Sequence, residues 1–274
     1  MTIRLDFPSP PKIQLHRALS GRGKKLSDGQ TVPRFEATIK HAPLTGIARY
    51  RRICLDATTG GVPLAFPHIL AAPLHYAIFT HKEMPLPALG LVHVRNSITS
   101  HAPLDPSQPL SLSVWCEGHE AVRSGVEITL HTSASVNGEV VWEETTTALS
   151  RAGKGTGGPR VVEPEPLVGL TRSVSWRLPA DLGRRYAPVA GDHNPIHLYP
   201  LTAKLFGFSR PIIHGMWMIG RIGGSMAPQA PCTVEMEFRR PVLLPGTVFF
   251  SASKDGRFDV RSSRGKLHMY GCVR

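Results

Sequence analysis

The chain is poor in cysteine, and its few cysteines are not arranged for a metal or for a disulfide framework. Cys54, Cys116, Cys232 and Cys272 are dispersed over 274 residues, and no two of them form a Cys-x-x-Cys pair. A structural zinc site needs closely spaced ligand pairs, and a disulfide-rich fold needs many cysteines in a short chain. Free thiols in a reducing compartment are therefore expected.

Long apolar runs are also missing. Residues 1–19 carry several charges together with Pro8, Pro10 and Pro11, without the apolar stretch of a secretory signal. No uninterrupted apolar segment elsewhere reaches the length that a membrane-spanning helix requires. The sequence predicts a cytoplasmic protein with no membrane partner.

Acidic side chains are outnumbered, and aromatic side chains are sparse. The sequence has 32 Lys and Arg against 20 Asp and Glu, a net charge of +12, with 7% aromatic residues. The basic residues are scattered, with no long basic tail and no interleaved aromatic stripe, so nucleic acid is not the expected partner. A positive balance of this kind also suits a phosphate-bearing ligand or an acidic carrier protein.

The first half of the chain combines one strongly apolar segment with a run of strand patterns. Apolar residues cover every face of a helix predicted from about residue 67 to 80, which places that helix inside a core. His68 and His75 on this helix are expected to be core histidines with satisfied hydrogen bonds. Strand periodicity follows in segments 91–98, 110–116, 122–135 and 140–149. Asn137-Gly138, before the last of these, indicates a tight hairpin.

The second half repeats this plan after a linker rich in Gly and Pro at residues 151–166. A second apolar helix is expected at about 211–225, and strands are expected at about 170–177, 233–238, 248–253, 258–262 and 267–273. Both halves place an apolar helix before antiparallel strands, which indicates a weak internal duplication. The chain therefore divides into an N-terminal unit at 1–150, irregular at its start apart from one strand at about 34–40, and a C-terminal unit at 167–274.

Residues 186–218 hold the densest set of chemically active side chains. Asn194-Pro195 has the form of a helix start, because Asn is a good N-cap and Pro fits the first helical position. The helix would run to about residue 206. Asp192 lies in the loop before that helix, and His197 lies in its first turn. A carboxylate and an imidazole would then converge near the positive end of a helix, which predicts an acid/base pair.

Short motifs in this region carry a resemblance to a known family. Gly191-Asp-His-Asn-Pro-Ile-His197 is followed by Gly207-Phe208 and by Pro211-Ile-Ile-His-Gly-Met216. This pattern closely resembles the signature of the MaoC-like dehydratases, the (R)-specific enoyl-CoA hydratases. The resemblance implies an α+β double hotdog, with two antiparallel sheets that each wrap a central apolar helix, and an N-terminal unit that accommodates the acyl chain. It also implies reversible hydration of trans-2-enoyl thioesters to (R)-3-hydroxyacyl thioesters.

Carried over by motif position, the resemblance assigns roles to individual residues. Asp192 and His197 would hold one water against the double bond, with Asp192 as the principal base. The Gly215 N–H would be the oxyanion contact, because a glycine lets the substrate approach the backbone closely. Asn194 would hold the loop in shape.

Other residues are expected to support this site. Tyr186 would pack over the loop, and His214 would form hydrogen bonds within the entry of the second apolar helix. Arg239 and Arg240 are candidates to contact a phosphate of coenzyme A. The resemblance implies no metal and no redox cofactor, with coenzyme A as part of the substrate. An acidic acyl carrier protein would also suit the charge of the chain.

Two rival functions stay open from the sequence. A hotdog acyl-CoA thioesterase needs only a well-placed carboxylate to drive water at the carbonyl, whereas the Asp192/His197 pair favours hydration. A non-catalytic acyl-thioester-binding protein would keep the loop for its structure alone. Because hotdog sheets often pair, a homodimer of the double unit is a further expectation.

Overall fold

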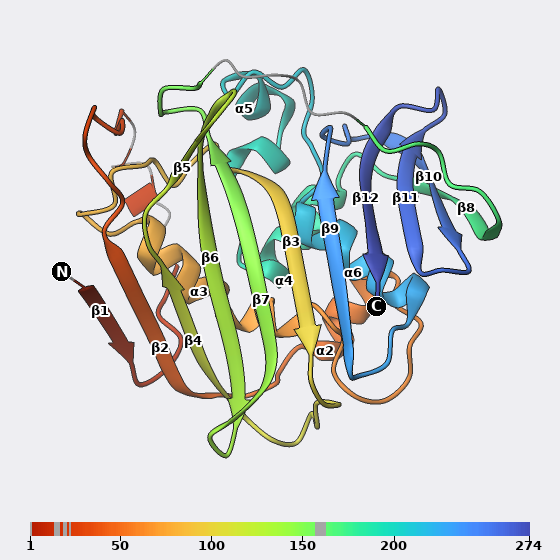
Figure 1. The fold of residues 1–274 in the computed structure, drawn as a ribbon, viewed down its shortest axis with the longest axis horizontal. Helices are drawn as coiled ribbons and strands as arrows, with labels where there is room; N and C mark the ends of the chain where they lie inside the picture. Colours follow the sequence, from red (N-terminus) through yellow and green to blue (C-terminus); the bar gives the residue numbers. More distant parts are fainter. Residues whose placement is uncertain (1, 14–16, 19–20, 22, 157–162) are drawn as a thin grey trace.

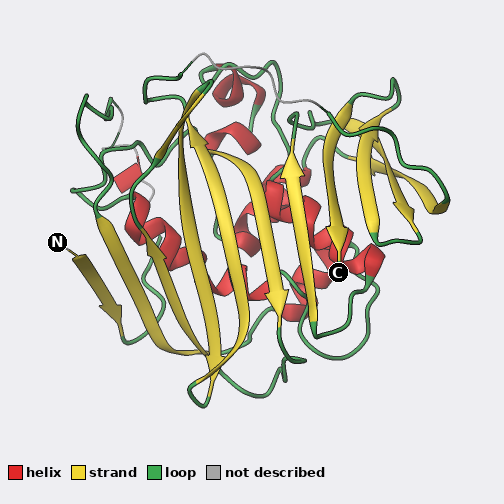
Figure 2. Cartoon of the chain, viewed as in Figure 1, coloured by secondary structure: helices red, strands yellow, loops and turns green. Residues whose placement is uncertain are grey.

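The computed structural model describes residues 2–13, 17–18, 21, 23–156 and 163–274. Its strands form one twelve-stranded sheet, and the helices lie on a single side of that sheet (Figures 1 and 2). No described helix has the length and apolar character needed to cross a membrane. The sheet therefore organises the chain, and the site has to be built from the helices and loops that cover it.

The N-terminal half supplies one half of the sheet. In spatial order its main strands are β2 (Arg34–Ala42), β4 (Leu110–Cys116), β6 (Gly125–Val136), β7 (Glu139–Ser150) and β3 (Val92–Ser100). Between β6 and β7, Asn137 (φ 52°) and Gly138 (φ 88°) are both left-handed, as a two-residue hairpin that matches the strand twist requires. The predicted hairpin is confirmed, and so are the predicted strands of this half.

The C-terminal half repeats this arrangement. Its strands, in spatial order from the centre of the sheet, are β9 (Cys232–Phe238), β12 (Leu267–Val273), β11 (Arg257–Ser262), β10 (Gly246–Ser253) and β8 (Leu170–Leu178). In chain order, the first of the five strands in each half (β2 and β8) is the outermost of the five, and the second (β3 and β9) is at the centre of the sheet. The strand order therefore agrees with an internal duplication.

The prediction of two separate antiparallel sheets is wrong. The central strands β3 and β9 pair with each other, with Asn96 opposite Met236, so the two half-sheets join into one. Without this pairing each strand would present a row of unpaired N–H and C=O groups at an open edge. The sheet is also mixed, because β1 (Thr2–Phe7) runs parallel to β2. A short strand, β5 (Glu120–Val122), pairs with β6.

The two apolar helices are present, one in each half. α3 (Phe66–Phe79) agrees with its prediction. α6 (Gly215–Met226) begins four residues later than expected, because the backbone before it is engaged elsewhere. The Ile212 N–H donates to the Ile196 carbonyl, and the Ile213 N–H donates to the Val242 carbonyl. The late start places Gly215 at the first position of the helix.

The helix expected from residue 195 to 206 is broken into two pieces. A 3-10 turn, η1 (Pro195–His197), is followed by α5 (Pro200–Lys204). Tyr199 between them is extended (φ −136°, ψ 150°), as the residue before a proline tends to be. Pro200 therefore ends the first helical turn and starts a new one.

In the described chain, two helices and two strands, β1 and β5, were not anticipated. α2 (Ile47–Cys54) is short, and α4 (Leu182–Ala190) contains Pro188, which hides the helical pattern. β1 lies in the stretch that we expected to be irregular. In the predicted linker, residues 151–156 and 163–166 form no helix or strand, and 157–162 lie outside the described residues.

The core lies between the helices and the sheet. Trp142 on β7 and Trp217 on α6 are both buried. Each indole N–H is satisfied by a backbone carbonyl: Trp142 donates to Leu64 (2.8 Å) and Trp217 donates to Ile53 (2.9 Å). Because Ile53 lies on α2, the second bond ties α2 to the helix that begins at the candidate site.

Candidate active site

The loop after α4 positions the predicted carboxylate. α4 ends at Ala190 with Gly191 as its C-cap, and Asp192 then accepts a hydrogen bond at Oδ1 from the Asn194 N–H (3.0 Å). Asn194 in turn caps η1, with its Oδ1 accepting from the Ile196 N–H (3.5 Å). Such side-chain bonds to the backbone two residues on fix a turn locally. Asn194 therefore bonds to both sides of this turn, and its role in shaping the loop stays a prediction.

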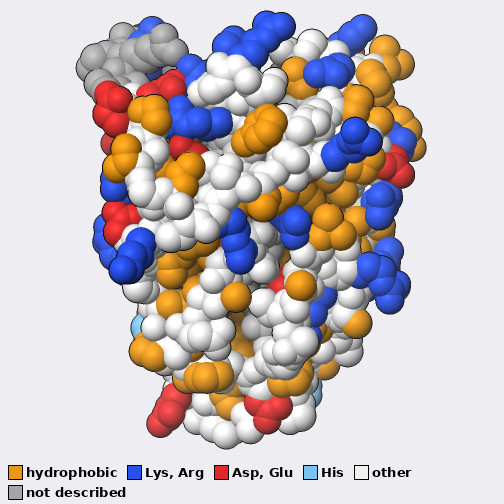
Figure 3. Space-filling view, turned by 90° about the vertical axis from the view of Figure 1, so that its right-hand side faces the viewer, with side chains coloured by type: hydrophobic (Ala, Val, Ile, Leu, Met, Phe, Trp, Pro, Cys, Tyr) orange, Lys and Arg blue, Asp and Glu red, His pale blue; other side chains and the backbone are white. Residues whose placement is uncertain are grey.

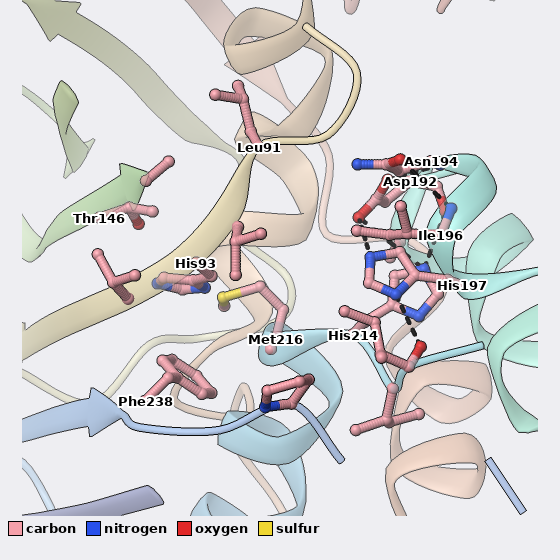
Figure 4. A pocket seen from close by; sticks show the side chains of 18 of the residues that line it. Leu91, His93, Thr146, Asp192, Asn194, Ile196, His197, His214, Met216 and Phe238 are labelled. Carbon is pink, nitrogen blue, oxygen red and sulfur yellow. Dashed lines mark hydrogen bonds and ion pairs between the residues drawn. The ribbon is translucent and has the colours of Figure 1, made fainter. Parts of the chain in front are cut away.

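His197 is held in one tautomer by the backbone. Its Nδ1–H donates to the Ile212 carbonyl (2.8 Å), because a carbonyl oxygen can only accept. Its Nε2 lies 3.8 Å from Oδ2 of Asp192. This separation is too long for a direct hydrogen bond and fits two acceptors that share one bridging water. Figure 4 shows the two side chains facing each other across this gap.

His214 lies behind the pair and holds it in place. The ring stacks on His197 with centroids 3.7 Å apart, and the Tyr186 ring packs edge-on against it at 5.0 Å. The Nε2–H of His214 donates to the backbone carbonyl of Asp192 (3.0 Å). Both predicted supporting residues, His214 and Tyr186, are therefore brought to the pair, with His214 bonded to the loop itself.

The electrostatics set complementary charge states for the pair. Burial acts to raise the pKa of Asp192, but His214, His197 and the Asn194 N–H outweigh it and hold the pKa below its usual value. Burial lowers the pKa of His197, against the opposing effect of Asp192. At neutral pH the site therefore holds a carboxylate beside a neutral imidazole whose Nε2 lone pair is free to accept. Such a pair can take a proton from one water.

The start of α6 lies beside this pair. His214 is the N-cap residue of α6, so the first N–H groups of the helix, beginning at Gly215, have no partner within the helix. A Cβ on Gly215 would lie 2.9 Å from Nδ1 of His93 and 3.2 Å from Phe238. The position therefore has no room for a side chain.

These residues line one cavity of about 490 Å³, to which both halves of the chain contribute. Asp192 is 48% exposed within it, so its carboxylate is open to a ligand. Figure 4 shows His93, on β3, on the opposite side of the pocket from Asp192, with Met216 between them. His68 and His75, expected to be core histidines, also line this cavity. No sequence pattern pointed to His93 as a residue of the site.

Arg239 and Arg240 both line the cavity. Each is also paired within the protein, Arg239 with Glu237 and Arg240 with Glu163. A phosphate would have to share these guanidinium groups with the carboxylates, so contact with coenzyme A stays a prediction.

Among the described residues, two clusters have the composition of a metal site. In each of Asp192/His197/His214 and His68/His75/Glu144, the candidate ligand atoms lie within 4.8 Å of one another. In the first cluster, Nδ1 of His197 and Nε2 of His214 are already bonded to carbonyl oxygens. A cation between these side chains would have to displace at least the bond of His214, so the geometry favours water over a metal here.

Buried neutral histidines predict a loss of stability in acid. Burial lowers the pKa of both His75 and His214 to about 3, against an unfolded value of 6.5. Between these values the unfolded chain binds protons that the native chain does not. The free energy of unfolding should be highest above pH 6.5 and should fall by about 1.4 kcal/mol per histidine per pH unit below it. Denaturant titrations at several pH values measure this slope. His75→Leu removes one of the two titrating groups, so it should reduce the slope by about 1.4 kcal/mol per pH unit. An unchanged slope would contradict the assignment.

The fold and the site together define a hotdog-type hydro-lyase, an α+β protein in which a carboxylate and a neutral imidazole face a shared cavity. Comparison with known proteins agrees. The family described as MaoC like domain matches residues 162–269. The 3-hydroxyacyl-thioester dehydratase X of Mycobacterium tuberculosis is 31% identical over 270 residues, covering 95% of this chain and 96% of that protein. The chain belongs to the MaoC-like dehydratase family.

Further similarities are shorter or structural. The (R)-specific enoyl-CoA hydratase of Aeromonas caviae is 36% identical over 64 residues, which cover 23% of this chain and 48% of that protein. The crystal structure of HtdX from Mycobacterium tuberculosis has a TM-score of 0.76 at 30% identity, covering 86% of this chain and 98% of that one. A conserved hypothetical protein of the same organism, described as a double hotdog fold, has a TM-score of 0.59 at 13% identity, covering 93% and 98%. This last similarity concerns the fold alone.

Proposed function

We propose that the chain reversibly hydrates trans-2-enoyl thioesters to (R)-3-hydroxyacyl thioesters, with coenzyme A as the carrier. The observation that carries this proposal is the gap of 3.8 Å between Oδ2 of Asp192 and Nε2 of His197. Both atoms are acceptors, so one water can donate a hydrogen bond to each and present its oxygen lone pair to the substrate. Adding water to an enoyl thioester needs this arrangement, because the nucleophile has to be held and deprotonated at once.

In the hydration direction, Asp192 takes a proton from the bound water as its oxygen forms a bond to C3. The C2–C3 double-bond electrons move towards the thioester carbonyl, which becomes an enolate. A proton is then delivered to C2 from the Asp192/His197 pair, so that one whole water is added and the pair returns to its starting state. Dehydration is the same path reversed.

The developing enolate charge is stabilised at the start of α6. The thioester oxygen accepts from the free N–H of Gly215, at the positive end of the helix. A side chain at Gly215 would collide with His93 and Phe238, so a larger residue would shift the start of α6 and with it this N–H.

The choice of coenzyme A rests on charge. Arg239 and Arg240 line the same cavity as the acid/base pair. The face that carries β8, β10, β11 and β12 has many Lys and Arg side chains and few Asp and Glu (Figure 3). Anionic carriers suit such a surface, and the Aeromonas caviae relative is named for a coenzyme A thioester and for (R) specificity.

The test is loss of the enoyl absorbance when the purified protein meets trans-2-enoyl-CoA substrates of short and long chain. Hydration to the (R) alcohol is expected, with chiral analysis of the product and parallel assay of the acyl carrier protein thioester. Release of free thiol without hydration would instead make the protein a thioesterase. Acyl-CoA binding with neither reaction, in a folded protein, would make it a binding protein.

The pH profile of kcat/KM follows from the charge states of the pair. Hydration needs ionised Asp192 and neutral His197, and the pKa of each is held below its ordinary value, 3.8 and 6.5 respectively. Lowered pKa values keep both groups deprotonated to lower pH, so kcat/KM should stay constant from neutral pH down through 6.5 and fall only below it. An acid limb at or above pH 6.5 in the rate profile would contradict this assignment.

A further inference from the structure

His93 on β3, which the proposed reaction does not use, carries a hydrogen-bond acceptor whose position is fixed. The Nε2–H of His93 donates to the Arg95 carbonyl (3.0 Å), because a carbonyl oxygen can only accept. Nε2 therefore holds the proton of the neutral ring, and Nδ1 is left with a lone pair. Burial lowers the pKa of His93 to about 4, so the ring is neutral at physiological pH and keeps this lone pair.

The lone pair is accessible to a ligand. Among the described residues Nδ1 of His93 has no hydrogen-bond partner, yet it is not one of the buried polar atoms left unpaired, so it has surface in the cavity that the residue lines. His68, on α3, differs in this respect. Its Nδ1–H donates to the Glu144 carboxylate on β7 (2.6 Å), and a neutral and a charged ring form that bond equally well. His93 is thus the histidine whose free nitrogen is defined as an acceptor.

Contacts with two residues place this acceptor beside the start of α6. A Cβ on Gly215 would lie 2.9 Å from Nδ1 of His93 and 3.2 Å from the Phe238 ring. The rings of His93 and Phe238 pack on each other with centroids 4.8 Å apart. Because the proposed function places the thioester oxygen on the Gly215 N–H, His93 adjoins the thioester. Asp192, which holds the water, is on the opposite side of the pocket (Figure 4).

Phe238 also indicates the direction in which the carrier leaves the site. It is the last residue of β9, and Arg239 and Arg240 follow it directly and line the same cavity. A carrier with its thioester at Gly215 and its phosphates at these arginines passes Phe238 and the ring packed on it. The first donor along such a carrier is the amide N–H of the pantetheine arm, which an ethylene link joins to the sulfur. The unsubstituted enoyl chain has no donor.

We propose that Nδ1 of His93 accepts a hydrogen bond from the amide N–H nearest the sulfur of the coenzyme A thioester. His93 is then a substrate-positioning residue that makes the site selective for pantetheine thioesters. This inference rests on the proposed function, because it takes the thioester oxygen to lie on the Gly215 N–H. An acyl carrier protein has the same pantetheine arm, and the parallel assay of the two carriers under the proposed function distinguishes them.

The experiment compares two small thioesters that differ in one group. An N-acetylcysteamine thioester keeps the amide N–H, and its counterpart has an ester oxygen in place of that N–H, with the same length and no donor. Saturated acyl versions report binding by calorimetry, and trans-2-enoyl versions report kcat/KM for hydration. The wild-type protein should favour the amide compound roughly fivefold to tenfold in both measurements, as one hydrogen bond between neutral groups allows.

His93→Phe is the decisive variant, because it removes the acceptor and keeps a ring to pack on Phe238. It should bind and hydrate the amide and ester compounds about equally. A merely structural defect would weaken both compounds in the same proportion and leave their ratio unchanged. His93→Asn places an acceptor oxygen, Oδ1, near the position of Nδ1 and should restore part of the preference.

The matched control for these variants is His131→Phe. The His131 ring also packs on an aromatic side chain, Trp115, at 5.1 Å, but it does not line the cavity. The control should keep the wild-type ratio of the two thioesters.

Three results would overturn the proposal. They are no preference for the amide compound in the wild-type protein, an undiminished preference in folded His93→Phe, and a preference that His131→Phe loses as well. A His93 that instead served a hydroxyl on the acyl chain would give the first result. Amide-selective binding without turnover would refute the proposed function and leave the role of His93 standing, whereas turnover at equal rates for both compounds would do the reverse. Failure to bind either thioester would refute both.

Discussion

Asp192→Asn is expected to lower kcat/KM for enoyl thioester hydration about a thousandfold, within the range of general acid–base catalysis. The asparagine amide cannot take a proton from the water, and this is the function of Asp192 in the proposed reaction. Its oxygen can still accept from the Asn194 N–H, as Oδ1 of Asp192 does at 3.0 Å, so the loop should keep its shape. Binding of a saturated acyl-CoA should therefore change little, which separates a chemical defect from a structural one.

Asp105→Asn is the matched control for this prediction. Oδ1 of Asp105 accepts from the Ser107 N–H at 2.8 Å, which is the same turn that Asp192 makes with Asn194, but Asp105 is exposed and does not line the cavity. The control should hydrate at the wild-type rate. Near-normal hydration by folded Asp192→Asn would remove this carboxylate from the mechanism.

The sequence was sufficient where local chemistry decides the structure. The strands of both halves and α3 follow from periodicity that tertiary packing reinforces. The acid/base pair follows from a motif whose parts lie close in the chain, because Asp192, Asn194 and His197 are joined by one turn. These features need no knowledge of which segments meet in space.

The sequence was insufficient where distant segments meet. Pairing of β3 with β9 turns two half-sheets into one, and neither strand alone signals which edge it will find. The late start of α6 depends on Ile212 and Ile213, whose N–H groups bond to Ile196 and Val242. His68 on α3 and Glu144 on β7 are 76 residues apart, so their bond could not be anticipated from a helix pattern that marked His68 as core.

His197→Ala is expected to lower kcat/KM for hydration roughly a hundredfold or more, as removal of a positioned general acid–base group does. The bound water would lose one of its two acceptors, and Asp192 alone would have to orient it. The loss should fall mainly on kcat, because His197 acts on the water and not on the thioester carrier. Steady-state rates with trans-2-enoyl-CoA measure this division.

A structural defect has to be separated from a chemical one in this variant, because the Ile212 carbonyl loses the donor that His197 provides at 2.8 Å. His131→Ala is a suitable control: the ring is partly buried and stacks on Trp115 at 5.1 Å, but it does not line the cavity. Both variants should lose some thermal stability, and only His197→Ala should lose hydration. Added imidazole should restore part of the rate to His197→Ala, since the vacated space adjoins the cavity and a free imidazole can accept from the same water. If the two variants lost activity in proportion to their stability, and imidazole restored none of it, His197 would be a structural residue and Asp192 would act alone.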